Sequence, residues 1–175
     1  MKLNFSFLVF AEVCLAGSIA TALQSDPSGH SSEVQGYNAI RSTLPNRTSI
    51  PVRLPRFIPN YADPEHPVFA IVESVNSDEY RVQLAWDKNC KGGNWCHLGE
   101  ITGSRLQAHA QRHGQIVKLA GDIRGCFTPA SMGAYCDDAK LEWEEGTFHY
   151  SIAMKCGTKR TLIEMARSAF RESQK

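Results

Sequence analysis

The last third of the chain has the clearest alternation of hydrophobic and polar residues. Within 140–155, "KLEWEEGTFHYSIAMK", two runs alternate with a period of two on either side of a tight turn at Glu145-Gly146. This period is typical of strands that bury one face of a sheet and leave the other in water. Two such runs joined by a short turn with glycine predict a β-hairpin.

Earlier segments predict more strands. Residues 68–75 are almost continuously apolar, and 80–86 alternate, so the two runs predict a second hairpin. Residues 98–104 predict a short strand. Residues 116–120 and 123–127 predict two more strands around a Gly121-Asp122 turn. Residues 105–115, between the predicted strands 98–104 and 116–120, are polar and predict a helical turn or a long excursion.

The chain ends in an amphipathic helix that is predicted to begin near Thr158 or Thr161, either of which can cap it. Its apolar stripe should pack on the sheet and consists of Leu162, Ile163, Ala166, Ala169 and Phe170. Together these elements predict an α+β fold, a curved antiparallel β-meander of six to seven strands with the C-terminal helix packed on one face. Residues 51–175 should form this single domain.

The N-terminal third differs in character from the rest. Lys2, the apolar stretch 3–20 and the small residues Ala20-Thr21-Ala22 predict a signal peptide over 1–22. Residues 23–50 are rich in Ser, Pro, Asn and Gly, which predicts a disordered linker. Three prolines within 51–59 predict an extended segment across the edge or open face of the sheet, with Leu54, Phe57 and Ile58 available to pack.

Composition narrows the class of protein. The chain has 175 residues, of which 42% are hydrophobic and 21% charged, so a folded globular core is expected. The formal net charge of +1 argues against nucleic acid as the main partner. The sequence contains no glycine-rich phosphate loop, serine elbow or paired-carboxylate signature, and no cofactor is expected.

Export would place the mature chain in an oxidising compartment. Loss of Cys14 with the signal peptide leaves five of the six cysteines, so one thiol stays free or pairs between chains. Cys90 and Cys96 flank Gly92-Gly93 and predict a small disulfide ring, worth about 2 kcal/mol. Trp95 lies inside this ring, where it either serves recognition or covers the bond.

Several segments together carry a resemblance: "VRLPRFIP", "YRVQLAW", "CKGGNWCHLGEITGS" and "KLEWEEGTFHYSIAMKCGTKRTLIEMARSAF". In this order the chain resembles a family of uncharacterised exported bacterial proteins, mainly cyanobacterial. Its C-terminal part is similar to sheet-plus-helix envelope domains of unknown function. The resemblance implies a location and a shape, and it supplies no catalytic residues.

The remaining cysteines depart from that family. The relatives tend to have a close cysteine pair before the strand that holds Trp143, and the first of the pair falls at Met132 here, so Cys136 lacks its usual partner. In a simple meander Cys126, Cys136 and Cys156 gather at one sheet end, and the strands of Cys126 and Cys156 lie about 9–10 Å apart. Cys136 can reach either one. We favour a Cys126–Cys136 disulfide with Cys156 as the free thiol.

The sequence offers few groups for chemistry. His109 and His113 share a helix face by spacing but lack a further ligand, so no metal site is predicted. Cys156 lies near a helix start, and His149, the histidine nearest to it in the chain, should point to the opposite sheet face. We therefore expect a secreted or periplasmic, non-enzymatic binding or envelope-associated module. The alternatives are a carrier of a small lipid-like apolar ligand and a thiol-dependent enzyme.

Overall fold

A computed structural model describes residues 34–56, 58, 67–106, 114–133 and 135–170. The predicted signal peptide 1–22, residues 23–33 of the predicted linker, Phe57, and the histidines at 109 and 113 lie outside the described residues. The elements are α1 (Tyr37–Thr43), the 3-10 turn η1 (Leu44–Asn46), β1 (Phe69–Val75), β2 (Glu79–Ala85), β3 (His97–Arg105), β4 (Gln115–Ala120), β5 (Ile123–Thr128), β6 (Asp138–Glu145), β7 (Phe148–Lys155) and α2 (Lys159–Phe170).

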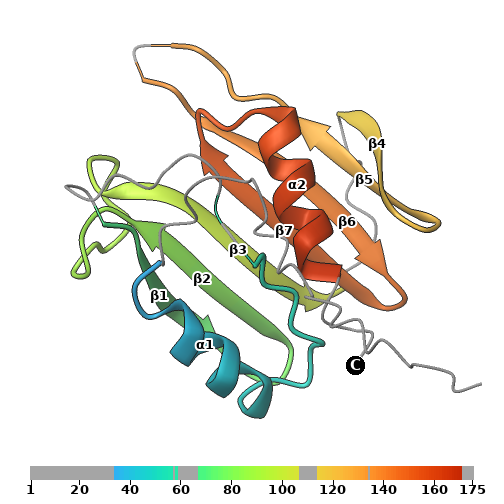
Figure 1. Cartoon of the computed structure of the whole chain (residues 1–175), viewed down its shortest axis with the longest axis horizontal. Helices are drawn as coiled ribbons and strands as arrows, with labels where there is room; N and C mark the ends of the chain where they lie inside the picture. Colours follow the sequence, from blue (N-terminus) through green and yellow to red (C-terminus); the bar gives the residue numbers. More distant parts are fainter. Residues whose placement is uncertain (1–33, 57, 59–66, 107–113, 134, 171–175) are drawn as a thin grey trace, which may run out of the picture.

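The strands form one antiparallel sheet, and the predicted fold class is confirmed. The described residues contribute seven strands in the order β1-β2-β3-β7-β6-β5-β4 (Figure 1). The chain thus builds one meander from β1 to β3 and another from β4 to β7, and the two join where β3 pairs with β7. This arrangement places β4 on an edge of the sheet and buries β7 in its centre.

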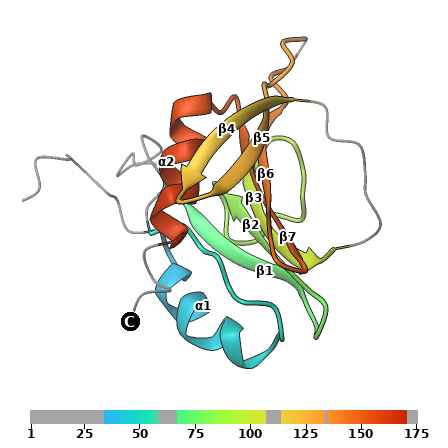
Figure 2. The ribbon, with the colours of Figure 1, turned by 90° about the vertical axis from the view of Figure 1, so that its right-hand side faces the viewer.

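Both helices lie on one side of the sheet, which we call the inner face (Figure 2). Alternation places the large apolar side chains of neighbouring strands opposite one another on this face. Ile101 pairs with Ile152, which pairs with Leu141, and all three are fully buried. Trp143 stacks on Tyr150 with ring centroids 5.5 Å apart. Each buried side chain of this size stabilises the fold by about 1.5–3 kcal/mol.

Helix α2 covers the half of the inner face formed by β4, β6 and β7. The Thr158 hydroxyl accepts a hydrogen bond from the Thr161 amide at 3.2 Å, so the earlier of the two predicted start sites caps the helix. Phe170 at the other end lies 5.6 Å from the ring of Trp143, as the predicted stripe requires. The stripe also includes Met165, fully buried, which the sequence analysis omitted.

The linker prediction is wrong for residues 34–50. Val34, Tyr37, Ile40 and Leu44 are buried. Tyr37 and Ile40 form the buried side of α1, while Val34 precedes the helix and Leu44 begins the 3-10 turn after it. The many polar residues between these buried positions made the composition of the segment look like that of a linker. The chain just before α1 also pairs with the edge of β1 through a parallel bridge between Gln35 and Phe69.

Residues 50–56 and 58, here called the strap, run extended between α1 and α2 (Figure 1). Leu54 and Ile58 are buried, as predicted. The Arg53 amide donates to the Tyr80 hydroxyl at 2.9 Å, and the Tyr150 hydroxyl donates to the Pro51 carbonyl at 2.9 Å. Burial raises the pKa of both tyrosines, so the hydroxyls stay protonated. The strap therefore lies across the inner face and not on an edge.

The strap is also held by charge. The Arg53 guanidinium binds the Glu145 carboxylate in a bidentate ion pair with Nη2 to Oε2 at 2.7 Å. The Trp143 indole donates to the same carboxylate at 3.0 Å. These contacts join the N-terminal segment to the turn between β6 and β7. On the inner face, Leu54 of the strap and Leu162 and Met165 of α2 are fully buried in the main core.

Candidate functional site

Two loops leave the sheet at the same end, which we call the loop end. Loop 86–96 joins β2 to β3, and loop 129–137 joins β5 to β6. Because all neighbouring strands are antiparallel, the start of β3, the start of β6 and the end of β7 coincide at this end. The loops therefore leave the same end of the sheet, with the end of β7 between their bases, although their sequences lie some forty residues apart (Figure 1).

Loop 86–96 is closed by the predicted Cys90–Cys96 disulfide, which is confirmed with a Cα–Cα distance of 5.7 Å. Gly92 adopts a φ of 76°, a conformation that favours glycine, and this allows the ring of residues 90–96 to close. The disulfide packs against Ala85 and Ile71 on the outer face of the sheet, opposite the helices. The loop thus has a small core of its own, separate from the main one.

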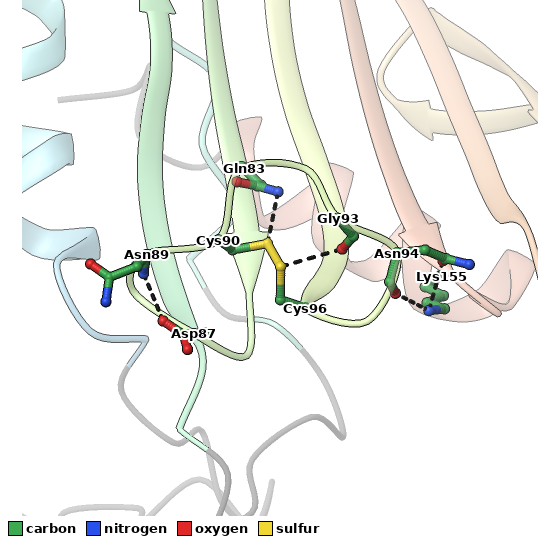
Figure 3. Close-up of a disulfide and its surroundings, with 8 residues drawn as sticks. All are labelled: Gln83, Asp87, Asn89, Cys90, Gly93, Asn94, Cys96 and Lys155. Carbon is green, nitrogen blue, oxygen red and sulfur yellow. Dashed lines mark hydrogen bonds between the residues drawn. A yellow bond between two sulfur atoms is a disulfide. The ribbon is translucent and has the colours of Figure 1, made fainter.

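The side chain of a buried glutamine contacts this ring. Gln83 is only 1% exposed, and its side-chain amide lies 3.4 Å from Cys90 Sγ (Figure 3). At the start of the loop the backbone amide of Asn89 donates to the Asp87 carboxylate at 2.7 Å, which fixes the turn before the first cysteine. The backbone that presents Trp95 is therefore held on both sides.

Loop 129–137 is attached to the end of β7 by a different disulfide from the one predicted. Cys136 bonds to Cys156, with a Cα–Cα distance of 5.5 Å, and Cys126 is the free, buried cysteine. The predicted Cys126–Cys136 bond and free Cys156 thiol are wrong. Cys126 lies within β5, opposite Glu142, whereas the Cys156 amide donates to the Asp137 carbonyl at 3.0 Å and so holds the end of the loop beside Cys156.

Polar contacts join the two loops to the sheet and to each other. Lys155 Nζ, at the end of β7, donates to the Asn94 carbonyl at 2.6 Å (Figure 3). His97 Nε2 lies 2.9 Å from Asp138 Oδ2, which connects the end of the first loop to the end of the second. Both loops are thereby anchored at their bases as well as by their disulfides.

Three exposed apolar side chains lie on the two loops of this sheet end. Trp95 is 75% exposed, Met132 83% and Tyr135 72%, and we call these three residues the loop triplet. Among the described residues, the remaining large apolar side chain of comparable exposure is Ile116, on the edge strand β4. Trp95 was predicted from the sequence as a candidate recognition residue, whereas Met132 and Tyr135 were not. The sequence signal for these two is that they are large apolar residues within a turn-rich segment.

The outer face of β5, β6 and β7 has a row of polar side chains. The contact with His149 at 3.5 Å and the ion pair with Lys140 at 2.9 Å lower the pKa of Glu142 from 4.5 to about 2. Glu142 also lies between Cys126 and Ser151 in register, and both of these are buried. The carboxylate is therefore charged and paired at neutral pH.

The residues of the predicted thiol enzyme do not come together. Cys156 is bonded to Cys136, while His149 contacts Glu142 near the other end of β7. A nucleophile needs a free thiolate with a base within hydrogen-bonding reach. The remaining thiol, Cys126, is on a different strand from His149 and is separated from it by β6.

Two further findings concern metals and membranes. Within the described ranges, no three or more His, Cys, Asp or Glu side chains are grouped so that they could hold a metal ion. In that same part of the chain, no helix has the length and apolar character needed to cross a membrane.

The fold and the loop end define a sheet-and-helix α+β module with two disulfides at one sheet end, as in proteins of oxidising compartments. Comparison of the chain with family models, with curated proteins and with solved structures gives no match in any of the three. The resemblance to exported bacterial proteins therefore stays a prediction.

Proposed function

We propose that the protein is an exported, non-enzymatic binding module that contacts a macromolecular partner through the loop triplet, Trp95, Met132 and Tyr135. The observation that carries the proposal is the position of these side chains. All three are more than 70% exposed, and all three are on the two loops of one sheet end. Exposed Trp, Tyr and Met side chains are enriched at the centres of protein interfaces.

The rigidity of the loops supports a binding role. Loop 86–96 is closed by the Cys90–Cys96 disulfide and tied to β7 by Lys155. Loop 129–137 is attached near its end to the end of β7 by the Cys136–Cys156 disulfide, and Asp138 at its base contacts His97. A side chain on a constrained backbone loses little conformational entropy when it binds, so its contact area contributes more fully to affinity. Aromatic residues with few rotatable bonds gain most from such preorganisation.

Export is part of the proposal and has two supports. The N-terminal residues have the pattern of a signal peptide, and the two disulfides are of the kind that persists in secreted or periplasmic proteins. The resemblance to exported bacterial proteins suggests an envelope component as the partner. The lipid-carrier alternative has less support, because the strap covers the inner face where such a ligand would bind.

Site-specific photo-crosslinking tests the proposal because it captures a partner that has not been identified. A benzophenone amino acid replaces Trp95 or Tyr135 in cells that produce the protein, and Thr147 serves as the control position. Thr147 is exposed and lies in the turn between β6 and β7, at the opposite end of the sheet. We expect adducts of one defined mass from positions 95 and 135 and none from 147.

The outcome that contradicts the proposal is equally specific. Adducts from position 147 alone would place the contact surface at the other end of the molecule. An absence of adducts at 95 and 135 in folded, exported protein would remove the binding role of the loop triplet.

A further inference from the structure

The β4–β5 hairpin has an open pocket on its outer face, away from the loop triplet. Its volume is about 570 Å³, within the range of about 300–1,000 Å³ that is typical of small-molecule sites. The hairpin forms the edge of the sheet beside α2 (Figure 2). We call this the hairpin pocket, and it is lined by Ile116, Val117, Lys118, Gly121, Asp122 and Arg124.

Two cations lie side by side in the lining of the pocket. Lys118 on β4 is the direct register partner of Arg124 on β5, and both side chains are exposed. Like charges at directly opposed positions destabilise an antiparallel pair. Neither side chain has an ion pair or hydrogen bond within the described part of the chain. Among the described lining residues, Asp122 is the single carboxylate, so the pocket has a net positive charge.

Protection of the sheet edge explains only one of these charges. A lysine on an edge strand discourages pairing with another chain, and β4 is an edge strand. Arg124 is on β5, which pairs with a strand on each side and needs no such protection. Binding of an anion between the two cations would remove the repulsion between them.

The hairpin is held in place by α2. Arg167 donates to the Leu119 carbonyl from Nε at 3.0 Å and to the Lys118 carbonyl from Nη2 at 3.1 Å. Val117 and Ile123 pack against the main core on the inner side. The backbone that positions Lys118 is thus fixed before any ligand arrives, and only side-chain rotation is needed for binding.

We propose that the hairpin pocket binds a phosphate monoester with an apolar substituent. At neutral pH such a group has a charge between −1 and −2 and three acceptor oxygens, which suits an ammonium group and a guanidinium fork placed side by side. The pocket is much larger than a bare phosphate. Ile116, 64% exposed, forms the apolar wall against which the substituent packs.

This site is independent of the proposed function. The loop triplet lies on the loops at one end of the sheet, whereas Lys118, Asp122 and Arg124 lie along the edge hairpin toward its turn. Substitutions in the hairpin pocket should leave crosslinking from position 95 unchanged. Failure of one proposal therefore leaves the other standing.

The test is a titration of the isotopically labelled full chain, followed by the backbone amide signals of residues 116–124. Phenyl phosphate is the main probe, with inorganic phosphate and benzoate as comparisons. We expect saturable shifts with phenyl phosphate, the same direction but weaker affinity with inorganic phosphate, and at least about tenfold weaker affinity with benzoate.

Two variants and a matched control complete the design. Lys118→Gln and Arg124→Gln should each weaken phenyl phosphate binding by about tenfold or more without loss of thermal stability, because each relieves the like-charge pair. Arg81→Gln is the control, because Arg81 is also exposed on the outer face but is paired with Glu100 at 2.8 Å. It should bind as the wild type does.

Three results would overturn the proposal. Without saturable shifts in 116–124, the pocket is not a site. If benzoate binds as tightly as phenyl phosphate, the ligand class is wrong. If Arg81→Gln weakens binding as much as Arg124→Gln, the anion senses only the general charge of the surface.

Discussion

Replacement of Leu54 by alanine tests whether the strap belongs to the folded core. Leu54 is 1% exposed and lies between points where the strap backbone is held, at Arg53 by Tyr80 and at Arg56 by Ser168, each at 2.9 Å. A buried Leu→Ala change costs about 2–5 kcal/mol, and the upper half of that range applies where the surroundings cannot collapse. Because hydrogen bonds fix the strap on both sides, we expect about 3–4 kcal/mol.

Urea unfolding followed by tryptophan fluorescence measures this cost, since Trp143 is fully buried beside the strap. The melting temperature should fall by about 10–15 °C in a folded body of this size. Leu54→Met keeps the volume and should cost less than about 1.5 kcal/mol. If Leu54→Ala cost less than about 1 kcal/mol, the strap would be a loosely attached segment and the account of the inner face would be wrong.

Two other predictions concern the second disulfide and the outer face. In urea unfolding, the Cys136→Ser/Cys156→Ser variant should lose about 3 kcal/mol of unfolding free energy and the Cys90→Ser/Cys96→Ser variant about 2 kcal/mol. The losses differ because the two disulfides join cysteines 20 and 6 residues apart and so remove different amounts of loop entropy from the unfolded chain. Equal losses would refute this prediction. The folded-state pKa of Glu142 is about 2, below its ordinary value of 4.5, so its stabilisation is present above pH 4.5 and lost as pH falls toward 2. Partial exposure reduces this stabilisation to about 1 kcal/mol. The Glu142→Gln variant should therefore be less stable than the wild type by that amount at pH 6 and equally stable near pH 2. A stability difference that does not change with pH would contradict the pairing of Glu142.

Local patterns in the sequence were sufficient to predict the strands. The alternation in 140–155 and the Gly121-Asp122 turn correspond to observed hairpins, because side-chain period and turn chemistry are local properties of the chain. The start of α2 at Thr158 and the packing of Phe170 on Trp143 were also predictable for this reason. The small Cys90–Cys96 ring depended on the same kind of short-range signal.

Pairings between distant segments were not predictable from the sequence. The contact of β3 with β7 depends on the whole arrangement, and nothing in residues 97–105 specifies which strand lies beside them. Cys136 bonds to Cys156 and not to Cys126, and this pairing likewise depends on where loop 129–137 lies in the folded protein. The helix at 37–43 was missed because two buried residues within seven give a weak periodic signal until the sheet that they contact is known.

The arrangement of the loop end depends on the second disulfide, which holds the end of loop 129–137 at the end of β7. Peptide mapping of the unreduced protein by mass spectrometry, with free thiols blocked before and after unfolding, tests this most directly. We predict the linked peptides Cys90–Cys96 and Cys136–Cys156, with Cys126 labelled only after unfolding, because it is free and buried. A Cys126–Cys136 peptide, or rapid labelling of Cys156 in the folded protein, would contradict the account.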